Sequence, residues 1–535
     1  MKRFEVCLLL SFIAGSAFGD TVSQSVTLKG KSGEVQSTVV VNSQCPAGRL
    51  LITNDGLRPR KPGTVVGIDL DDPKATPVDA TFEKETDPDL ADELFGTNDH
   101  DIFPLPDSDD VLLLWGVHLK TPLTPKPAWF DSAYKGSFGP GARRGTIVFR
   151  SHDCGKTFTY LTKIDPAKVD PVAGNTICAY PELPIPGAEP HLAAGGSDGQ
   201  LARVLTDHKV YLAMGCMGQK PGPPAANGAY TSSSDPVGRT YLLRSTDGSS
   251  WATLGHIDGG ALWRPDLLAR PNGDVAVSVG NAFVYGNVAH PASAKEPPGW
   301  GDKWTVQTRQ LSSVMGSPIT GPVGASLAFL AYPAMIPQSL TTSAFGYRLF
   351  RYDPASAEFA ELDPIVSTAP PPSVSVVKSG PLPIAVRNAV MHVTAIAAAG
   401  GPTLLYWNDV DNATATVRMR GRFLFPDGTD SEDFALASDA SFPIASPAWY
   451  GHYRTAGGYA TKPKFEGTPT TIEYHYYPIW VPGDGTVRYT HLVAAATPVK
   501  PPLKKPGTLA KGKPGPGPVE LKTFLAGQRL QREEE

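Results

Sequence analysis

The chain has 535 residues, a formal net charge of −4 and 41% hydrophobic residues. This length allows one large repeat domain or about three domains of ordinary size, and the hydrophobic content is enough to build a core. Because the net charge is small, no global field directs the chain to nucleic acid or to an anionic membrane. The 54 glycines and 53 prolines indicate a chain that turns often.

Residues 1–19 have the pattern of a secretory signal peptide. The basic start MKRFE precedes the apolar run VCLLLSFIAGSAF, and Ala17 and Gly19 offer a cleavage site before Asp20. Cys7 lies inside the apolar run, too early for a lipid-modified cysteine, so no lipid anchor is expected. No later run approaches the roughly 18 apolar residues that a membrane span needs. We therefore predict a soluble, exported protein that is secreted or periplasmic.

Four cysteines remain after removal of the signal peptide: Cys45, Cys154, Cys178 and Cys216. In an oxidising compartment an even number favours two disulfides, and three connectivities can be drawn. The gaps between these cysteines are far too wide for a CxxC-like metal site, so disulfides are the favoured interpretation.

Short apolar runs of β type follow one another along the chain. They are rich in Val, Leu, Tyr and Phe and are separated by turn residues; examples are VLLLWGVHL, GTIVF, KVYLAMGC, TYLLR, DVAVSVG, YRLFRY, TLLYW and TVRYTHLV. Helical periodicity is almost absent. Many short antiparallel strands over this length predict an all-β chain, and a β-propeller divides such a length more naturally than a sandwich does.

One motif occurs twice, as FRSHDCGKTFTYL at 149–161 and as the one-residue-shorter variant LRSTDGSSWATL at 243–254. In each copy a Ser is followed by an Asp, a Gly and an aromatic residue that begins a new apolar run. The Asp can hydrogen-bond the backbone of its own turn, the Gly can supply a positive φ, and the aromatic residue can pack into the sheet. The motif therefore predicts a self-contained hairpin that needs no ligand.

The pattern Ser-x-Asp-x-Gly-x-Thr-aromatic resembles the Asp box, or BNR repeat, of the sialidase (neuraminidase) superfamily. The residues that carry the resemblance are Ser151, Asp153, Gly155, Thr157, Phe158, Ser245, Asp247 and Trp251. The resemblance implies a sialidase-like β-propeller in which each box closes the hairpin between outer strands of a blade, away from the active site. Sortilin-type receptors and assembly factors also carry this box, so the motif indicates a fold rather than a chemistry.

Six four-stranded blades are expected, beginning near residues 99, 189, 262, 320, 385 and 440. The strands near 24–53 are expected to pair with the last blade, because closure of the ring removes exposed edges. The predicted division is a signal peptide (1–19), N-terminal strands and an acidic loop that partly close the propeller (20–94), the propeller (95–496) and a Pro/Lys/Gly-rich disordered tail (497–535).

A sialidase-like site, which the resemblance implies, needs arginines for a substrate carboxylate, a Tyr nucleophile with a Glu that takes its proton, and an Asp acid/base. The catalytic candidates are Asp101, Tyr450 and Glu473, and the substrate-binding candidates are Arg264, Arg387 and Arg454. Each arginine is equally well explained as a surface or inter-blade ion-pair partner. In DIFPLPD, Phe103 stands where the family has its first arginine, which counts against standard sialic-acid binding.

Two further groups of residues leave alternatives open. Strand alternation puts Glu473, His475 and Tyr477 on one face, either at a carbohydrate site or as packing against a neighbouring blade. The stretch NDHD at 98–101 and the acidic segment before it are either a solvated loop, the default, or a Ca²⁺ site. No other cofactor is expected.

Two functions remain open on the sequence alone. One is an exo-acting, sialidase-like glycoside hydrolase that releases a terminal acidic sugar from extracellular glycans. The other is a non-catalytic propeller that binds a protein or glycan through its loop-rich face. In either case the protein is expected to be a monomer.

Overall fold

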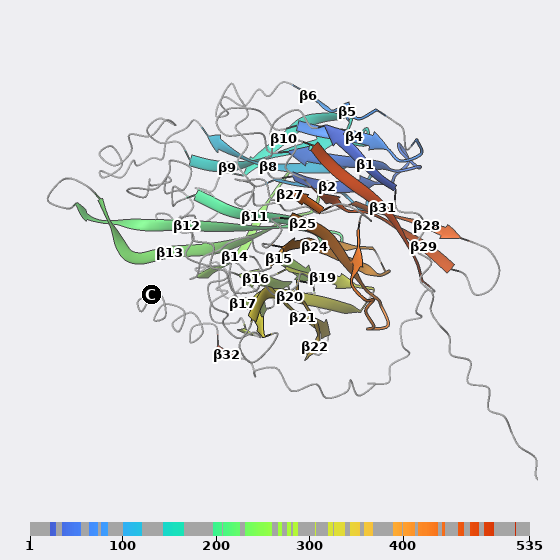
Figure 1. The fold of residues 1–535 in the computed structure, drawn as a ribbon. Coiled ribbons are helices and arrows are strands. Elements are labelled where there is room, and N and C mark those ends of the chain that lie inside the picture. Colours follow the sequence, from blue (N-terminus) through green and yellow to red (C-terminus); the bar gives the residue numbers. More distant parts are fainter. Residues whose placement is uncertain are drawn as a thin grey trace, which may run out of the picture.

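The computed structural model describes residues 22–27, 35–54, 64–72, 76–83, 100–119, 143–164, 196–205, 207–224, 230–258, 266–269, 275–279, 282–286, 305–306, 319–324, 326–337, 343–353, 358–367, 389–398, 400–411, 416–436, 441–443, 458–464, 471–480, 486–496 and 519–520. Every element assigned within these residues is a β-strand, as the sequence predicts (Figure 1). No helix in this part of the chain is long and apolar enough for a membrane span.

The first three four-stranded units follow one another along the chain, and we number them as blades from the N-terminus. Blade 1 contains β2 (Val35–Val40), β3 (Arg49–Asn54), β4 (Thr64–Asp69) and β5 (Val78–Asp79). Blade 2 contains β7 (His100–Pro104), β8 (Val111–Leu119), β9 (Arg143–Ser151) and β10 (Thr157–Ile164), with β6 (Thr81–Phe82) parallel to β10. Blade 3 contains β11 (Gly196–Val204), β12 (Val210–Pro224), β13 (Tyr230–Ser245) and β14 (Ala252–Asp258).

The next two blades have the same order of strands from the inside outward. Blade 4 contains β15 (Asp266–Ala269), β16 (Val275–Val279), β17 (Ala282–Gly286) and β18 (Thr305–Val306). Two residues of the C-terminal segment, β32 (Val519–Glu520), pair with β18. Blade 5 contains β19 (Ile319–Val323), β20 (Leu327–Pro337), β21 (Ser343–Asp353) and β22 (Glu358–Ile365).

The last two blades complete the ring. Blade 6 contains β23 (Ala389–Ala397), β24 (Thr403–Asp411) and β25 (Thr416–Leu424), whose outer edge pairs with β26 (Phe434–Ala435) and β27 (Ser441–Pro443). Blade 7 contains β28 (Gly458–Lys464), β29 (Thr471–Tyr477) and β31 (Thr486–Ala496), and β30 (Ile479–Trp480) pairs with β31. Its outer strand is β1 (Val22–Thr27), which lies beside β31 in Figure 1.

The described strands form six hydrogen-bonded sheets, and the nine-stranded one contains both blade 5 and blade 6, which gives seven blades. A single parallel pair, Phe345 with Ala389, joins those two blades. The innermost strands β2, β7, β11, β15, β19, β23 and β28 each contact the next, and β28 contacts β2, so the ring is closed. The all-β propeller predicted from the sequence is therefore confirmed, whereas the blade count differs from the expected six by one.

The additional blade is blade 1, whose strands the sequence assigned to the last blade. Its four strands pair only with one another in the described residues, and the sheet is buried on both faces. Val40, Leu51 and Val65 pack with blade 2, while Val35 and Leu50 pack with blade 7. Only β1, from the same N-terminal region, pairs with blade 7.

Apolar side chains fill the spaces between neighbouring blades, and this is where the core lies. One cluster joins blades 2 and 3 through residues such as Leu112, Leu114, Leu212 and Tyr241, and equivalent clusters join blades 5 and 6, 6 and 7, and 7 and 1. Each fully buried aliphatic side chain contributes about 1.5–3 kcal/mol to folding. Because strand alternation sends successive residues to opposite neighbours, blades 1, 2, 6 and 7 are each packed on both faces.

Candidate functional site

The turns between the first and second strands of neighbouring blades meet at one end of the ring. Asn42 Nδ2 of blade 1 donates to the Asp109 carbonyl of blade 2 (2.7 Å), and His208 of blade 3 lies 2.7 Å from Asp107 of blade 2. In blades 5 and 6, Gly324 N donates to the Gly401 carbonyl (3.0 Å). These contacts show that the innermost strands end at a common face, which we call the turn face, and begin at the opposite one, the entry face.

The first corner, between β9 and β10, is closed by its own side chains. Asp153 Oδ1 accepts hydrogen bonds from Thr157 N (2.8 Å), Lys156 N (3.1 Å) and Ser151 Oγ (2.7 Å), and Ser151 Oγ accepts one from Gly155 N (2.8 Å). Burial alone would raise the pKa of Asp153, but these hydrogen bonds together lower it below its ordinary value. The self-bonded turn expected from the sequence is present.

The second corner, between β13 and β14, keeps this chemistry with one residue fewer. Gly248 N again donates to the hydroxyl of the preceding Ser, Ser245 Oγ, at 2.8 Å, while Asp247 Oδ1 accepts from the backbone and the hydroxyl of Ser249. The Ser249 hydroxyl and N–H lower the pKa of Asp247. Trp251 Nε1 donates to the Gly248 carbonyl (2.9 Å), and its ring packs against the core between blades 2 and 3.

A third corner, which the search for the motif in the sequence missed, lies in blade 6 at PDGTD, residues 426–430. Asp427 Oδ1 accepts from Thr429 N (2.9 Å) and Thr429 Oγ1 (2.7 Å), the same two contacts that Asp247 makes with Ser249. No Ser precedes it; instead Gly428 N donates to the carbonyl of Phe425. The Asp-Gly-hydroxyl triplet was the available signal, and the missing Ser concealed it.

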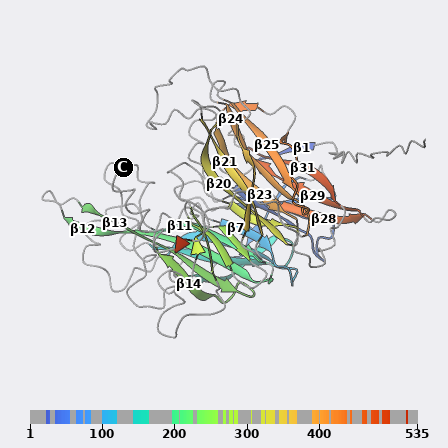
Figure 2. The same ribbon diagram turned by 90° about the horizontal axis from the view of Figure 1, so that it is seen from below.

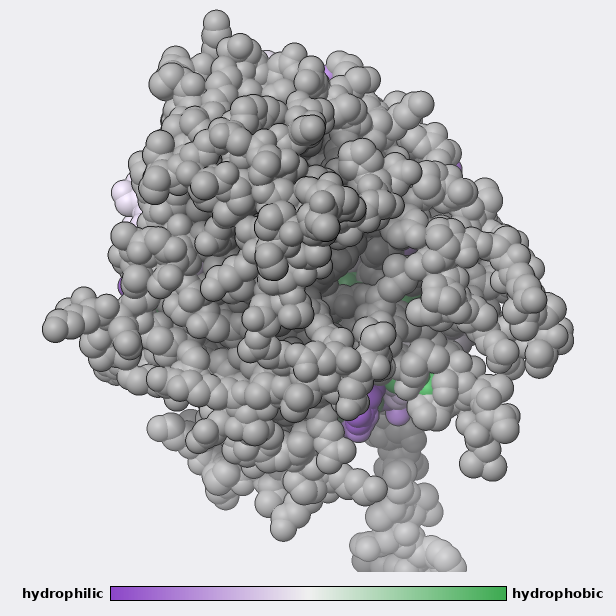
Figure 3. Space-filling view, turned by 90° about the vertical axis from the view of Figure 1, so that its left-hand side faces the viewer, coloured by the Kyte–Doolittle hydropathy of each residue, from purple (hydrophilic) through white to green (hydrophobic). Residues whose placement is uncertain are grey.

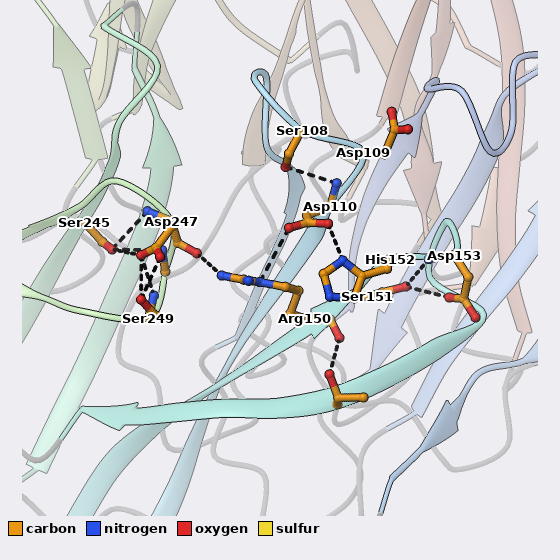
Figure 4. Close-up of polar contacts among 12 residues, drawn as sticks. Ser108, Asp109, Asp110, Arg150, Ser151, His152, Asp153, Ser245, Asp247 and Ser249 are labelled. Atoms are coloured by element: carbon orange, nitrogen blue, oxygen red, sulfur yellow. Dashed lines mark hydrogen bonds and ion pairs between the residues drawn. The ribbon is translucent and has the colours of Figure 1, made fainter.

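Corners also connect neighbouring blades, as Figure 4 shows for Arg150, which lies between Asp110 and Asp247. Arg150 Nη2, from the third strand of blade 2, donates to the Asp247 carbonyl in blade 3 (2.6 Å). Arg351 Nη1, from the third strand of blade 5, donates in the same way to the Gly428 carbonyl in blade 6 (2.6 Å). An arginine on the third strand of one blade therefore donates to the corner of the next blade at two places in the ring, between blades 2 and 3 and between blades 5 and 6.

The first corner is also attached covalently to blade 1. Cys154, one residue before Gly155, forms a disulfide with Cys45, which lies between β2 and β3 and is 109 residues away. This pair is one of those expected; Cys178 and the side chain of Cys216 lie outside the described residues. The corners thus hold blades together at the turn face, and they offer no chemistry to a ligand at the entry face.

The turn between β7 and β8 carries three carboxylates, Asp107, Asp109 and Asp110, and Figure 4 shows Asp110 beside Arg150 and His152. Asp109 accepts from Ser43 N in blade 1 (3.2 Å) and from the Ser43 hydroxyl, and Asp107 contacts His208 in blade 3. Asp110 lies 2.5 Å from His152 Nδ1 and 3.6 Å from Arg150 Nε, both in its own blade. Asp107 and Asp109 are therefore used as inter-blade contacts, and Asp110 as a contact within blade 2.

Asp101, the predicted acid/base, lies in β7 and is 1% exposed. Its Oδ2 accepts a hydrogen bond from Ala202 N of β11 at 2.7 Å, so the carboxylate joins the innermost strands of blades 2 and 3. Phe103, which the sequence resemblance places where sialidases have an arginine, packs against the core between the same two blades. His100, next to Asp101, is fully buried beside Trp115.

Glu473 lies in β29, in a different sheet from Asp101. It pairs with Lys462, whereas the entry end of β28 is marked by the pair Gly458–Tyr477, so Glu473 lies toward the turn face. Tyr477, at the entry end, is 7% exposed and packs between blades 7 and 1. Burial and the neighbouring Tyr489 raise the pKa of Tyr477 to about 12, so its hydroxyl stays neutral.

The remaining site predictions, Tyr450, Arg264, Arg387 and Arg454, lie outside the described residues. So do Asn98 and Asp99 of the NDHD stretch, and within the described ranges no group of three His, Cys, Asp or Glu side chains is placed to hold a metal ion. Figure 3 views the side from which the β12–β13 hairpin extends, and few described side chains reach the surface there. Figure 2 shows the same hairpin reaching beyond the other strands.

One buried carboxylate at the entry face was not singled out in the sequence. Asp409 of β24 pairs with Val390, the second residue of the innermost strand β23, and is 3% exposed. Its Oδ1 accepts from Ser367 Oγ (2.5 Å), which follows the last strand of blade 5. The contact fixes the start of the connection from blade 5 to blade 6.

No protein-family model and no curated protein matches the chain. Among solved structures it is similar to a GH93 α-L-arabinofuranosidase of Fusarium graminearum (13% identity, 74% of this chain and 92% of that one, TM-score 0.34). It is also similar to a Hadza microbial sialidase (10%, 74% and 65%, TM-score 0.31) and to a mutant Trypanosoma rangeli sialidase that displays trans-sialidase activity (11%, 73% and 57%, TM-score 0.33). At these scores the similarities do not bear on activity, and the propeller fold is established by the strand pairing of this chain.

Proposed function

We propose that the protein is an exported β-propeller that binds acidic glycans at its entry face. The proposal depends chiefly on where three arginines fall in the chain relative to the innermost strands. Arg264 comes two residues before β15, Arg387 two residues before β23 and Arg454 four residues before β28. Because these strands begin at the same face, we expect the three guanidinium groups to lie near that face, each preceding a different blade.

Guanidinium groups are suited to this ligand class because their planar fork pairs with a carboxylate through two hydrogen bonds. A sugar acid presents such a carboxylate together with hydroxyl groups. The turn face, by contrast, uses its arginines within the fold, since Arg150 and Arg351 donate to corner carbonyls of neighbouring blades. The proposal therefore assigns the ligand to the three arginines that precede innermost strands and not to Arg150 and Arg351.

Binding without hydrolysis is the form of this function that we favour. Asp101 is almost fully buried and accepts a backbone hydrogen bond, and Glu473 lies toward the turn face. Hydrolysis is the second candidate, because Tyr450 and Arg454 precede the same innermost strand, β28. In that case the tyrosine would attack the anomeric carbon of an acidic sugar, as in sialidases.

The test is to offer the purified protein a fluorogenic sialoside and, separately, an immobilised sialylated glycan with its desialylated counterpart. Binding that requires the carboxylate and falls at least tenfold in Arg387→Ala supports the proposal, with Arg348→Ala as the control because Arg348 pairs with Glu361 on an exposed strand. Hydrolysis of the sialoside by the unmodified protein, lost in Tyr450→Phe, would show that the protein is a glycoside hydrolase. Equal binding of both glycans would show that acidic sugars are not the ligand.

A further inference from the structure

Two histidines share a hydrogen bond in the sheet that closes the ring. His475 Nδ1 of β29 and His491 Nε2 of β31 are 2.8 Å apart, and their rings are stacked with centroids 5.1 Å apart. Tyr477 continues the stack on the other side of His491, at 4.7 Å and an interplanar angle of 1°. His491 also lies directly opposite Val22 of β1, so the stack includes a residue of β31, the strand that pairs with β1.

The proton count of this pair is restricted by its geometry. A hydrogen bond between two ring nitrogens needs one donor and one acceptor, so the pair is satisfied with two neutral imidazoles or with one imidazole and one imidazolium. When both rings are protonated, both facing nitrogens carry N–H groups and no acceptor remains. Two positive charges then lie about 3 Å apart in a half-buried place, where their repulsion is stronger than in water.

In the described strands of this sheet, positively charged side chains outnumber carboxylates. In the sequences of β1, β28, β29, β30 and β31, Glu473 is the one carboxylate, against Lys462, Lys464 and Arg488. Burial raises the pKa of Tyr489 and, most strongly, of Tyr477, so the phenols nearby remain neutral. From blade 1, the charged groups of β2 to β4 are Arg49 and Asp69, which pair with each other.

We propose that the His475–His491 pair is an acid-sensitive switch on the closure of the propeller. With at most one proton the pair joins β29 to β31 and supports the pairing of β31 with β1. Uptake of the second proton breaks the hydrogen bond and favours release of β1 from the edge of blade 7. The protein is then tightly closed at neutral pH and loosened in an acidic compartment.

The sign of the effect follows from linkage. The opened sheet binds one proton more than the closed sheet, because separated histidines titrate freely near their ordinary value of about 6.5. Closure is therefore favoured above this pH and is weakened as the pH falls below it. A difference of one proton increases the opening equilibrium by up to about tenfold per pH unit.

Amide hydrogen exchange on the full chain between pH 7.5 and pH 4.5 tests the proposal. The expected result is a fall in the protection factors of β1 and β31 of up to about tenfold per pH unit below pH 6, with the other sheets changing less. In His491→Gln, the glutamine can still bond His475 but leaves one titrating ring, so most of this fall should disappear. His208→Gln is the matched control, since His208 of blade 3 is a half-exposed histidine paired with Asp107 of blade 2.

Equal loss of protection in all sheets, or an unchanged acid response in His491→Gln, would overturn the proposal. A second measurement needs no variant: the histidine ring signals of the unmodified protein are followed by NMR, with His491 assigned through its contact with Tyr477. The pair should titrate in two steps separated by more than one pH unit. Two coincident, ordinary titrations would also refute the switch.

Discussion

Asp153 shows how much one side chain does in the first corner, since a single carboxylate oxygen accepts from two backbone N–H groups and a hydroxyl. Asp153→Ala leaves these donors unpaired and should lower the free energy of unfolding by about 2 kcal/mol, while Asp153→Asn, which keeps an acceptor, should lose less than half of that. Chemical denaturation at neutral pH measures both. Equal losses in the two variants would contradict the hydrogen-bonding explanation.

The same carboxylate makes the corner sensitive to strong acid. Because its pKa in the folded state is lowered, Asp153 stabilises the fold above its ordinary value of 3.8 and loses this contribution as the pH falls through the lower folded value. The acid unfolding profile of Asp153→Asn should therefore be flatter than that of the unmodified protein below pH 4. This range is well below that of the histidine switch, so the two effects are separable.

Gly155 is required in the same corner for two reasons, and a second glycine separates them. Its φ is +77°, and a Cβ there would overlap Leu51 of blade 1; Gly400 has a similar φ of +70° but nothing within 4 Å of a Cβ. Gly400→Ala should cost about 1 kcal/mol from backbone strain alone, and Gly155→Ala about 1–3 kcal/mol more from overpacking. If the two variants lost the same free energy of unfolding, the contact of residue 155 with Leu51 would not contribute to stability.

Among the strands and turns, the disulfide is the strongest connection between blades 1 and 2. It joins the β2–β3 turn to the corner of blade 2 across 109 residues, so the unfolded chain loses much freedom when the bond is present. Replacing Cys45 and Cys154 together by Ala should lower the free energy of unfolding by about 2–5 kcal/mol. Denaturation with and without a dithiol reductant provides the control, because the variant should no longer respond through this bond.

At the scale of the whole molecule, we expect β1 to stabilise the closed ring by covering the outer edge of blade 7. A chain that begins at Lys29 lacks β1 and exposes the edge of β31, whereas a chain that begins at Val22 keeps it. We expect the shorter chain to unfold at a lower temperature and to aggregate through the free edge, and the longer one to behave like the mature protein. Scanning calorimetry and light scattering measure these outcomes; equal behaviour of the two chains would show that β1 does not close the ring.

How much the sequence determined depends on how far apart the interacting residues are. The corner at 151–158 could be predicted because an Asp, a Gly and an aromatic residue within eight positions fix a turn by local hydrogen bonds. The strands and the propeller class followed from equally local apolar patterns and turn signals. The positions of Arg264, Arg387 and Arg454 remain predictions from the sequence.

Tertiary structure decided what depends on distant partners. It made residues 35–79 a blade of their own, because that sheet is buried between blades 2 and 7. It chose Cys45 as the partner of Cys154 and turned Asp101 toward a backbone N–H 101 residues away. Local chemistry cannot determine such choices, since burial and pairing over these distances depend on how the whole ring closes.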